Sequence, residues 1–103
     1  MTTAQVLRKA KGLIRKHGWV QRVFGNSETG YCVMGAIRRA SPALGVGGRD
    51  AFANALPSHM RGIVGPTAWN DAPRRTKAEV LRAFDKAIAL AEKPKRKAKR
   101  GRK

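Results

Sequence analysis

The first seventeen residues alternate apolar and basic positions with the period of an α-helix. Positions on one face recur three and four residues apart, at Val6, Leu7, Ala10, Leu13, Ile14 and His17. This spacing is typical of a helix that packs one side against a core. Thr2 or Thr3 can cap its first turn, and Gly18 ends it. The pattern predicts an amphipathic helix at the start of the chain.

A second regular pattern closes the folded part of the chain. Thr76 and Glu79 have the spacing of a capping box, in which each residue bonds the backbone amide of the other. The apolar positions that follow are Val80, Leu81, Phe84, Ala87, Ile88 and Ala91. We expect a helix over residues 77–92 that contributes much of the core.

Between these two helices the chain is interrupted by glycine and proline. Residues 19–24 (WVQRVF), followed by the turn GNSETG, favour a short strand or extended hook. Helical spacing returns over 31–40, where Gly35 is expected to permit close approach of another helix or an aromatic ring. Residues 42–48 are interpreted as a flexible connection, and 49–56 as a short helix.

These elements predict a mainly all-α fold. The 103 residues, 42% of them hydrophobic, suffice for one core but not two. We expect a single domain of four or five short helices over residues 1–92, with a short extended hook near residues 19–31. Residues 93–103 are expected to form a disordered basic tail, because they contain no apolar residue large enough to bury.

The charge of the chain is strongly positive. The formal net charge is +17, of which residues 1–92 contribute +9 and the tail +8. The cations of the tail are Lys93, Lys95, Arg96, Lys97, Lys99, Arg100, Arg102 and Lys103. Each contact between a cation and a phosphate releases condensed counterions, so nucleic acid is the favoured partner. The Arg-Gly-Arg triplet at residues 100–102 resembles an AT-hook without its flanking prolines, but contact with phosphates regardless of sequence is favoured.

Two further sets of cations fall on helical faces of the predicted domain. Arg8, Lys11 and Arg15 lie close to one line on the first helix, and Arg38 and Arg39 lie opposite the apolar side of another. We predict that both sets bind nucleic acid together with the tail, on one continuous basic surface. The alternative is an ordinary solvated helix face.

The residues that could carry catalysis do not form a recognisable constellation. A triad would need Cys32 as nucleophile, His17 or His59 as base and Asp71 to orient the base, but spacing does not single these out. One cysteine and two separated histidines provide no zinc-type ligand pair. We therefore predict no enzyme activity, no catalytic residues, no metal and no cofactor, with core roles for Cys32 and His17.

Two aromatic residues and one loop have alternative interpretations. Trp19 and Tyr31 flank a turn with Arg22 nearby and could stack on nucleotide bases, but burial is favoured because the chain has few aromatic residues.

Residues 69–76 (WNDAPRRT) are interpreted as a structural loop, in which Trp69 anchors the chain on the core. The alternative is a loop that binds a ligand or partner.

The sequence also limits the compartment. A single cysteine fits a reducing environment, and no apolar run reaches the roughly 20 residues of a membrane span. The N-terminus lacks the pattern of a signal peptide. We expect a cytoplasmic protein that does not bind membranes, associated with the nucleoid if it binds DNA.

Several short motifs resemble a family of small helical proteins of actinobacteria and their phages. They are the Gly-Trp pair at 18–19, Cys-x-x-Gly-Ala at 32–36, and Trp-Asn-Asp-x-Pro-x-Arg-Thr at 69–76. The resemblance covers most of residues 6–92 but not the tail. It implies a compact helical intracellular module, with no established chemistry to carry over.

The sequence therefore favours non-enzymatic binding of nucleic acid, with double-stranded DNA preferred to RNA. The alternative is a small phage-type interaction protein that docks on a host protein, with the tail steering the encounter electrostatically. No recognition helix of a helix-turn-helix can be named, and the oligomeric state stays open.

Overall fold

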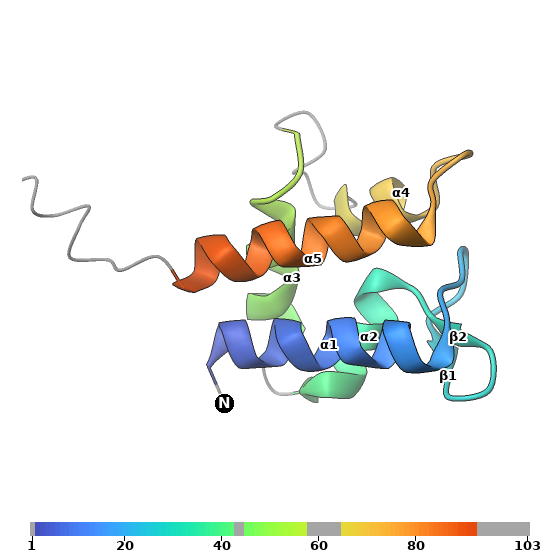
Figure 1. The fold of residues 1–103 in the computed structure, drawn as a ribbon, viewed down its shortest axis with the longest axis horizontal. Helices are drawn as coiled ribbons and strands as arrows, with labels where there is room; N and C mark the ends of the chain where they lie inside the picture. The colour runs from blue at the N-terminus through green and yellow to red at the C-terminus, as the bar shows by residue number, and fades with distance from the viewer. Residues whose placement is uncertain (1, 43–44, 58–64, 93–103) are drawn as a thin grey trace, which may run out of the picture.

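The computed structural model describes residues 2–42, 45–57 and 65–92. Within these ranges the chain forms five helices and one small hairpin, in a mainly helical single domain (Figure 1). The elements are α1 Thr3–His17, β1 Gly25–Asn26, β2 Gly30–Tyr31, α2 Val33–Ala40, α3 Gly45–Ala53, α4 Gly65–Asn70 and α5 Lys77–Glu92. The predicted fold class is thus confirmed, and the predicted tail lies outside the described residues.

Helix α1 begins and ends where local chemistry predicts. Thr2 and Gln5 form a capping box, in which each side chain accepts a hydrogen bond from the other residue's backbone amide. At the other end Gly18 adopts φ 108°, a left-handed conformation that favours glycine, and its N–H donates to the carbonyl of Ile14. The face that carries Val6 and its helical neighbours is buried, as the spacing indicates.

Helix α5 is also confirmed from Lys77 to Glu92. Thr76 Oγ1 accepts a hydrogen bond from the Glu79 amide at 3.2 Å, and Glu79 Oε1 accepts one from the Thr76 amide at 2.9 Å. Helices α1 and α5 lie side by side and antiparallel (Figure 1). This pairing places the two most regular apolar faces of the chain in one core.

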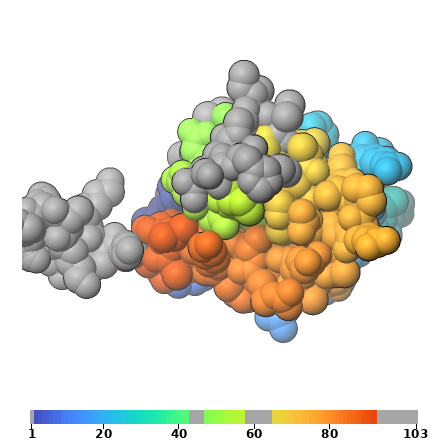
Figure 2. Space-filling view, turned by 90° about the horizontal axis from the view of Figure 1, so that it is seen from above, coloured from blue at the N-terminus to red at the C-terminus, as the bar shows by residue number. Residues whose placement is uncertain are grey.

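Three aromatic rings mark the centre of that core. The Phe52 ring lies 4.8 Å from Phe84 and 5.6 Å from Trp69, centroid to centroid. Helix α3 carries Phe52 across the α1 and α5 pair, and α3, α4 and α5 together cover one face of the domain (Figure 2). The rings therefore join α3, α4 and α5 through one cluster.

The hairpin confirms the predicted hook near residues 19–31. Strands β1 and β2 pair antiparallel, and Trp19 forms a bridge to Tyr31 beside them. The side chain of Asn26 closes the turn by accepting hydrogen bonds from the amides of Glu28 and Thr29. The hook thus connects the end of α1 to the start of α2.

Helix α2 begins later than predicted. Tyr31 belongs to β2, and Cys32 is the extended N-cap residue, whose Sγ accepts a hydrogen bond from the Gly35 amide at 3.2 Å. Both residues are buried. The segment 31–40 that was predicted as one helix therefore consists of a strand residue, a cap residue and the helix itself, all of which contribute to the core. Cys32 is buried as predicted, but at the cap.

The middle of the chain contains more helix than its glycines and prolines indicate. Helix α3 already begins at Gly45, within the predicted connection, and Gly48 faces Ile37, where a Cβ would lie 2.6 Å from the Ile37 side chain. Helix α4 was not predicted. Its Pro66 lies in the first turn, where the missing amide hydrogen has no helical partner to lose.

We expect Phe84→Ala to lower the free energy of unfolding by about 3 to 5 kcal/mol, because the fully buried ring leaves a cavity beside Phe52. Thr76→Ala should cost about 1 kcal/mol by removing the cap. Leu90→Ala, on the exposed side of the same helix, is the control and should change the value by less than about 0.5 kcal/mol. Chemical denaturation measures all three, and similar losses at Phe84 and Leu90 would contradict the assignment of the buried face.

Candidate functional site

The side chain of Asn70 holds three segments together at one end of the domain. Asn70 is 1% exposed, and its Oδ1 accepts hydrogen bonds from Trp19 Nε1 at 2.7 Å and from the Val33 amide at 3.1 Å. Its Nδ2 donates to the Val20 carbonyl at 3.2 Å and to Asp71 Oδ1 at 2.9 Å. One carboxamide thus connects the end of α4 with the segment after α1 and with the first turn of α2.

Further hydrogen bonds fix the segment after α1 against the loop after α4. Gln21 Nε2 donates to the carbonyls of Asn70 and Ala72 at 3.0 and 2.9 Å, and the Arg22 amide donates to Asp71 Oδ1 at 2.8 Å. The two segments lie at the same end of the molecule (Figures 1 and 2). The structural interpretation of Trp69, Asn70 and Asp71 is therefore supported.

Each of these two segments contains an arginine in a strained backbone conformation. Arg22 has φ 73° and Arg74 has φ 72°, values that residues with a Cβ rarely adopt. Such conformations cost roughly 1 to 3 kcal/mol and persist where surrounding contacts impose them. Here the bonds of the Gln21 side chain and of the Arg22 amide restrain the chain up to the turn, and the Phe24 carbonyl, bonded to the Cys32 amide, restrains it beyond the turn.

The strained turn presents two apolar side chains to solvent. Val23 is 59% exposed and Phe24 is 54% exposed, although Cys32 and Gly35 hold the backbone beneath them. The Phe24 carbonyl accepts a hydrogen bond from the Cys32 amide at 3.1 Å, and a Cβ on Gly35 would lie 2.0 Å from the Phe24 oxygen. Gly35 thus permits a close approach as predicted, but what approaches is the Phe24 backbone, not a helix or a ring.

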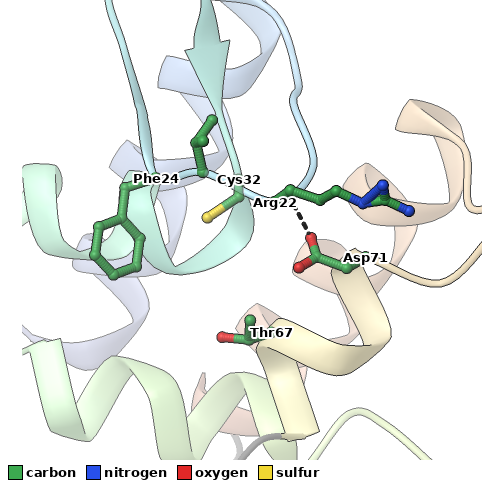
Figure 3. Close-up of a pocket in the computed structure, with 6 residues that line it drawn as sticks. Arg22, Phe24, Cys32, Thr67 and Asp71 are labelled. Atoms are coloured by element: carbon green, nitrogen blue, oxygen red, sulfur yellow. Dashed lines mark hydrogen bonds between the residues drawn. The ribbon is translucent and has the colours of Figure 1, made fainter.

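A cleft of about 300 Å³ opens beside this turn. It is lined by Arg22, Val23, Phe24, Cys32, Thr67 and Asp71. Figure 3 shows the Phe24 ring on one side of the cleft and Asp71 on the other, with Cys32 between them and Thr67 projecting from α4. The cleft combines an apolar wall with a carboxylate and a hydroxyl.

Two arginines stack on aromatic rings near this end, in different ways. The Arg38 guanidinium lies over the exposed Phe24 ring, 5.0 Å from its centroid. Arg75 lies 4.1 Å from the Trp69 centroid, donates to the Trp69 carbonyl and pairs with Glu79 at 3.6 Å. Arg75 is therefore occupied within the fold, whereas Arg38 stands on the surface beside the cleft.

The predicted nucleic-acid-binding residues fall into three groups. Arg8 pairs with Glu92 and Lys11 with Asp85, so this stripe of α1 faces α5 and two of its charges are compensated. Arg15, Arg38 and Arg39 are exposed. The tail residues Lys93, Lys95, Arg96, Lys97, Lys99, Arg100, Arg102 and Lys103 lie outside the described residues.

The residues considered for catalysis and stacking have structural contacts. The Cys32 thiol caps α2, and its burial raises its pKa. The His17 ring packs edge to face against Tyr31, and His59 lies outside the described residues. Trp19 is half-buried and Tyr31 is buried, which leaves Phe24 as the exposed ring that the sequence did not single out. Among residues 2–42, 45–57 and 65–92, no cluster of three His, Cys, Asp or Glu side chains could hold a metal.

Comparison with known proteins gives one match. A model described as "Family of unknown function (DUF6197)" matches residues 1–90, which include all of the motifs that carry the sequence-based resemblance. No curated protein and no solved structure matches the chain. None of the helices in the described part of the chain is long and apolar enough to cross a bilayer.

We expect Asn70→Ala to lower the free energy of unfolding by about 2 to 4 kcal/mol, because it leaves the buried amide of Val33 and the part-buried partners at Trp19 and Val20 without their hydrogen bonds. Asn70→Asp should also destabilise, since a carboxylate cannot donate to the Val20 carbonyl and would lie beside Asp71. The control is Asn26→Ala in the exposed hairpin turn, which should cost no more than about 1 kcal/mol. Equal losses at Asn70 and Asn26, measured by denaturation, would show that Asn70 is not a central contact.

Cys32 should react slowly with iodoacetamide in the folded protein at pH 8, because burial raises the pKa of the thiol and the thiolate is the reactive form. Below the ordinary pKa of 9.0 the thiol is protonated in both folded and unfolded chains. Above that value the unfolded chain ionises first, so the contribution of Cys32 to stability should fall as pH rises. The measurement compares alkylation rates with and without denaturant, and equal rates would contradict the burial.

Proposed function

The chain belongs to the family DUF6197, and we propose that it binds nucleic acid without catalysing a reaction. The observation that supports this proposal is the surplus of exposed cations on the folded domain. The described residues contain fourteen Lys and Arg against six Asp and Glu. A polyanion is the natural partner of such a surface, because phosphates can pair with charges that the fold itself leaves unpaired.

Five of the six acidic residues in the described part of the chain already have partners. Four of them form ion pairs: Glu92 with Arg8, Asp85 with Lys11, Asp50 with Arg49 and Glu79 with Arg75. Asp71 holds the Arg22 amide. Ten exposed cations form no ion pair with any described residue, namely Lys9, Arg15, Lys16, Arg22, Arg38, Arg39, Arg74, Lys77, Arg82 and Lys86.

The predicted binding residues with an ion pair should bind a phosphate less readily than those without one. A phosphate that contacts Arg8 or Lys11 competes with Glu92 or Asp85, whereas a phosphate at Arg15, Arg38 or Arg39 displaces no carboxylate of the described residues. We therefore assign the larger share of binding by the domain to the second group. The tail, with eight cations in eleven residues, supplies further contacts on the same proposal.

Double-stranded DNA is the first ligand to test, because phosphate contacts require no unpaired base. Duplex DNA also has a higher linear charge density than a single strand. The alternative function is docking on a host protein, as a phage-type interaction module would do. The exposed Val23 and Phe24 favour this alternative, since exposed apolar side chains held on a fixed backbone are typical of protein interfaces.

Two charge-matched variants test the proposal. Arg38→Gln with Arg39→Gln removes two unpaired cations, and Arg8→Gln with Lys11→Gln removes two paired ones. On a short DNA duplex, log affinity plotted against log salt should lose about 0.9 in slope per phosphate contact removed. We expect a loss of up to about 1.8 for the first variant and a smaller loss for the second.

Deletion of residues 93–103 should reduce the slope further and leave the circular dichroism spectrum unchanged in shape. Equal losses from the two double variants would indicate diffuse attraction without a preferred surface. If the intact protein binds neither duplex nor single-stranded nucleic acid at low salt, the proposal is wrong and docking on a protein becomes the better explanation.

A further inference from the structure

We infer that the cleft beside Phe24 binds one unpaired base of single-stranded nucleic acid, with the base stacked on the Phe24 ring. This inference rests on the proposed function and extends it, because it adds a contact that duplex DNA cannot make. In a duplex each base is already stacked and paired, so its face and its pairing edge are not available to the cleft.

The first support is the fixed position of the ring. Phe24 is 54% exposed, yet its carbonyl is bonded to the Cys32 amide and rests against Gly35. Two residues before it, the Arg22 amide is held by Asp71. A ring on a backbone restrained in this way loses little conformational freedom when a ligand binds. The free energy gained by stacking is therefore not offset by the cost of ordering the loop.

The second support is the placement of cations around the ring. The Arg38 guanidinium lies over Phe24, and Arg22 lines the cleft. A base in the cleft carries a phosphate on each side, and these two arginines are cations beside the cleft that can pair with such phosphates. Aromatic stacking beside cations is the usual combination in proteins that bind single strands.

The third support is the chemistry of the opposite wall. Asp71 and Thr67 lie across the cleft from Phe24 (Figure 3). Asp71 Oδ1 already accepts from the Arg22 amide and from Asn70, while its second carboxylate oxygen accepts no hydrogen bond from the described residues. A carboxylate accepts hydrogen bonds from the amino groups of bases. The cleft is therefore suited to a base with an exocyclic amino group.

The same wall argues against an apolar or a basic side chain in this cleft. An apolar side chain would contact Val23 and Phe24 but would offer no donor to Asp71. A lysine or arginine side chain would offer donors, but it would enter beside Arg22 and Arg38, which carry the same charge. An amino-bearing base is neutral and brings its own phosphates, so it satisfies both the carboxylate and the arginines.

The test compares single strands and duplexes of about 12 nucleotides, within the usual site size of roughly 4 to 16, on the full chain. Phe24→Ala should weaken binding of the single strand by roughly 5- to 150-fold and leave binding of the duplex nearly unchanged. Phe24→Tyr should retain the affinity for the single strand, because it keeps the ring. Leu90→Ala, another exposed apolar residue, is the control and should affect neither ligand. Thermal unfolding should show that every variant remains folded.

The outcomes separate this inference from the proposed function. If Phe24→Ala binds single strands as tightly as the intact protein does, or weakens both ligands equally, the base-binding cleft is wrong while charge-based binding stands. If the intact protein binds neither ligand, both fail. Single strands of deoxycytidine should bind more tightly than those of thymidine, because cytosine presents an amino group to Asp71. Equal affinities would overturn the role given to that carboxylate.

Discussion

The carboxamide of Asn70 is the contact on which the end of the domain that carries the cleft depends. It accepts from the Trp19 indole and the Val33 amide and donates to the Val20 carbonyl and Asp71. Only a side chain with both a donor and an acceptor group satisfies these partners at once, and burial makes any unmet group costly. The cleft, the turn at Arg22 and the start of α2 are all positioned through this one side chain.

Features that depend on neighbours in sequence could be predicted. The capping boxes at Thr2 and Thr76 and the apolar spacing of α1 and α5 are encoded within single helical turns. Helix α4 and the early start of α3 depend instead on tertiary packing. Gly48 has its place within α3 because Ile37 occupies the space that a side chain at this position would fill. Pro66 is tolerated because it lies in the first turn of α4. From the sequence alone, these glycines and this proline therefore indicated interruptions rather than helices.

The candidate site was predictable only in its charges. The sequence shows where the cations are, but not that Arg8 meets Glu92, 84 residues further along the chain. It also gave no reason to expect Phe24 at the surface, because the aromatic residues in its segment favoured burial. Exposure of this ring follows from the positive φ of Arg22 and from the space at Gly35, two features of the folded backbone that no spacing of side chains reveals.

The turn at residues 21–24 combines two unfavourable features that the fold maintains together. An arginine in the left-handed region is strained, and the exposed side chains of Val23 and Phe24 forgo the stabilisation that burial would give. The hydrogen bonds of Gln21, the Arg22 amide and the Phe24 carbonyl hold this arrangement in place. A simple connection between α1 and the hairpin would need neither strain nor exposed apolar side chains. Strain and exposure that are held by so many specific contacts are characteristic of binding sites, and here they coincide with a cleft and with unpaired cations.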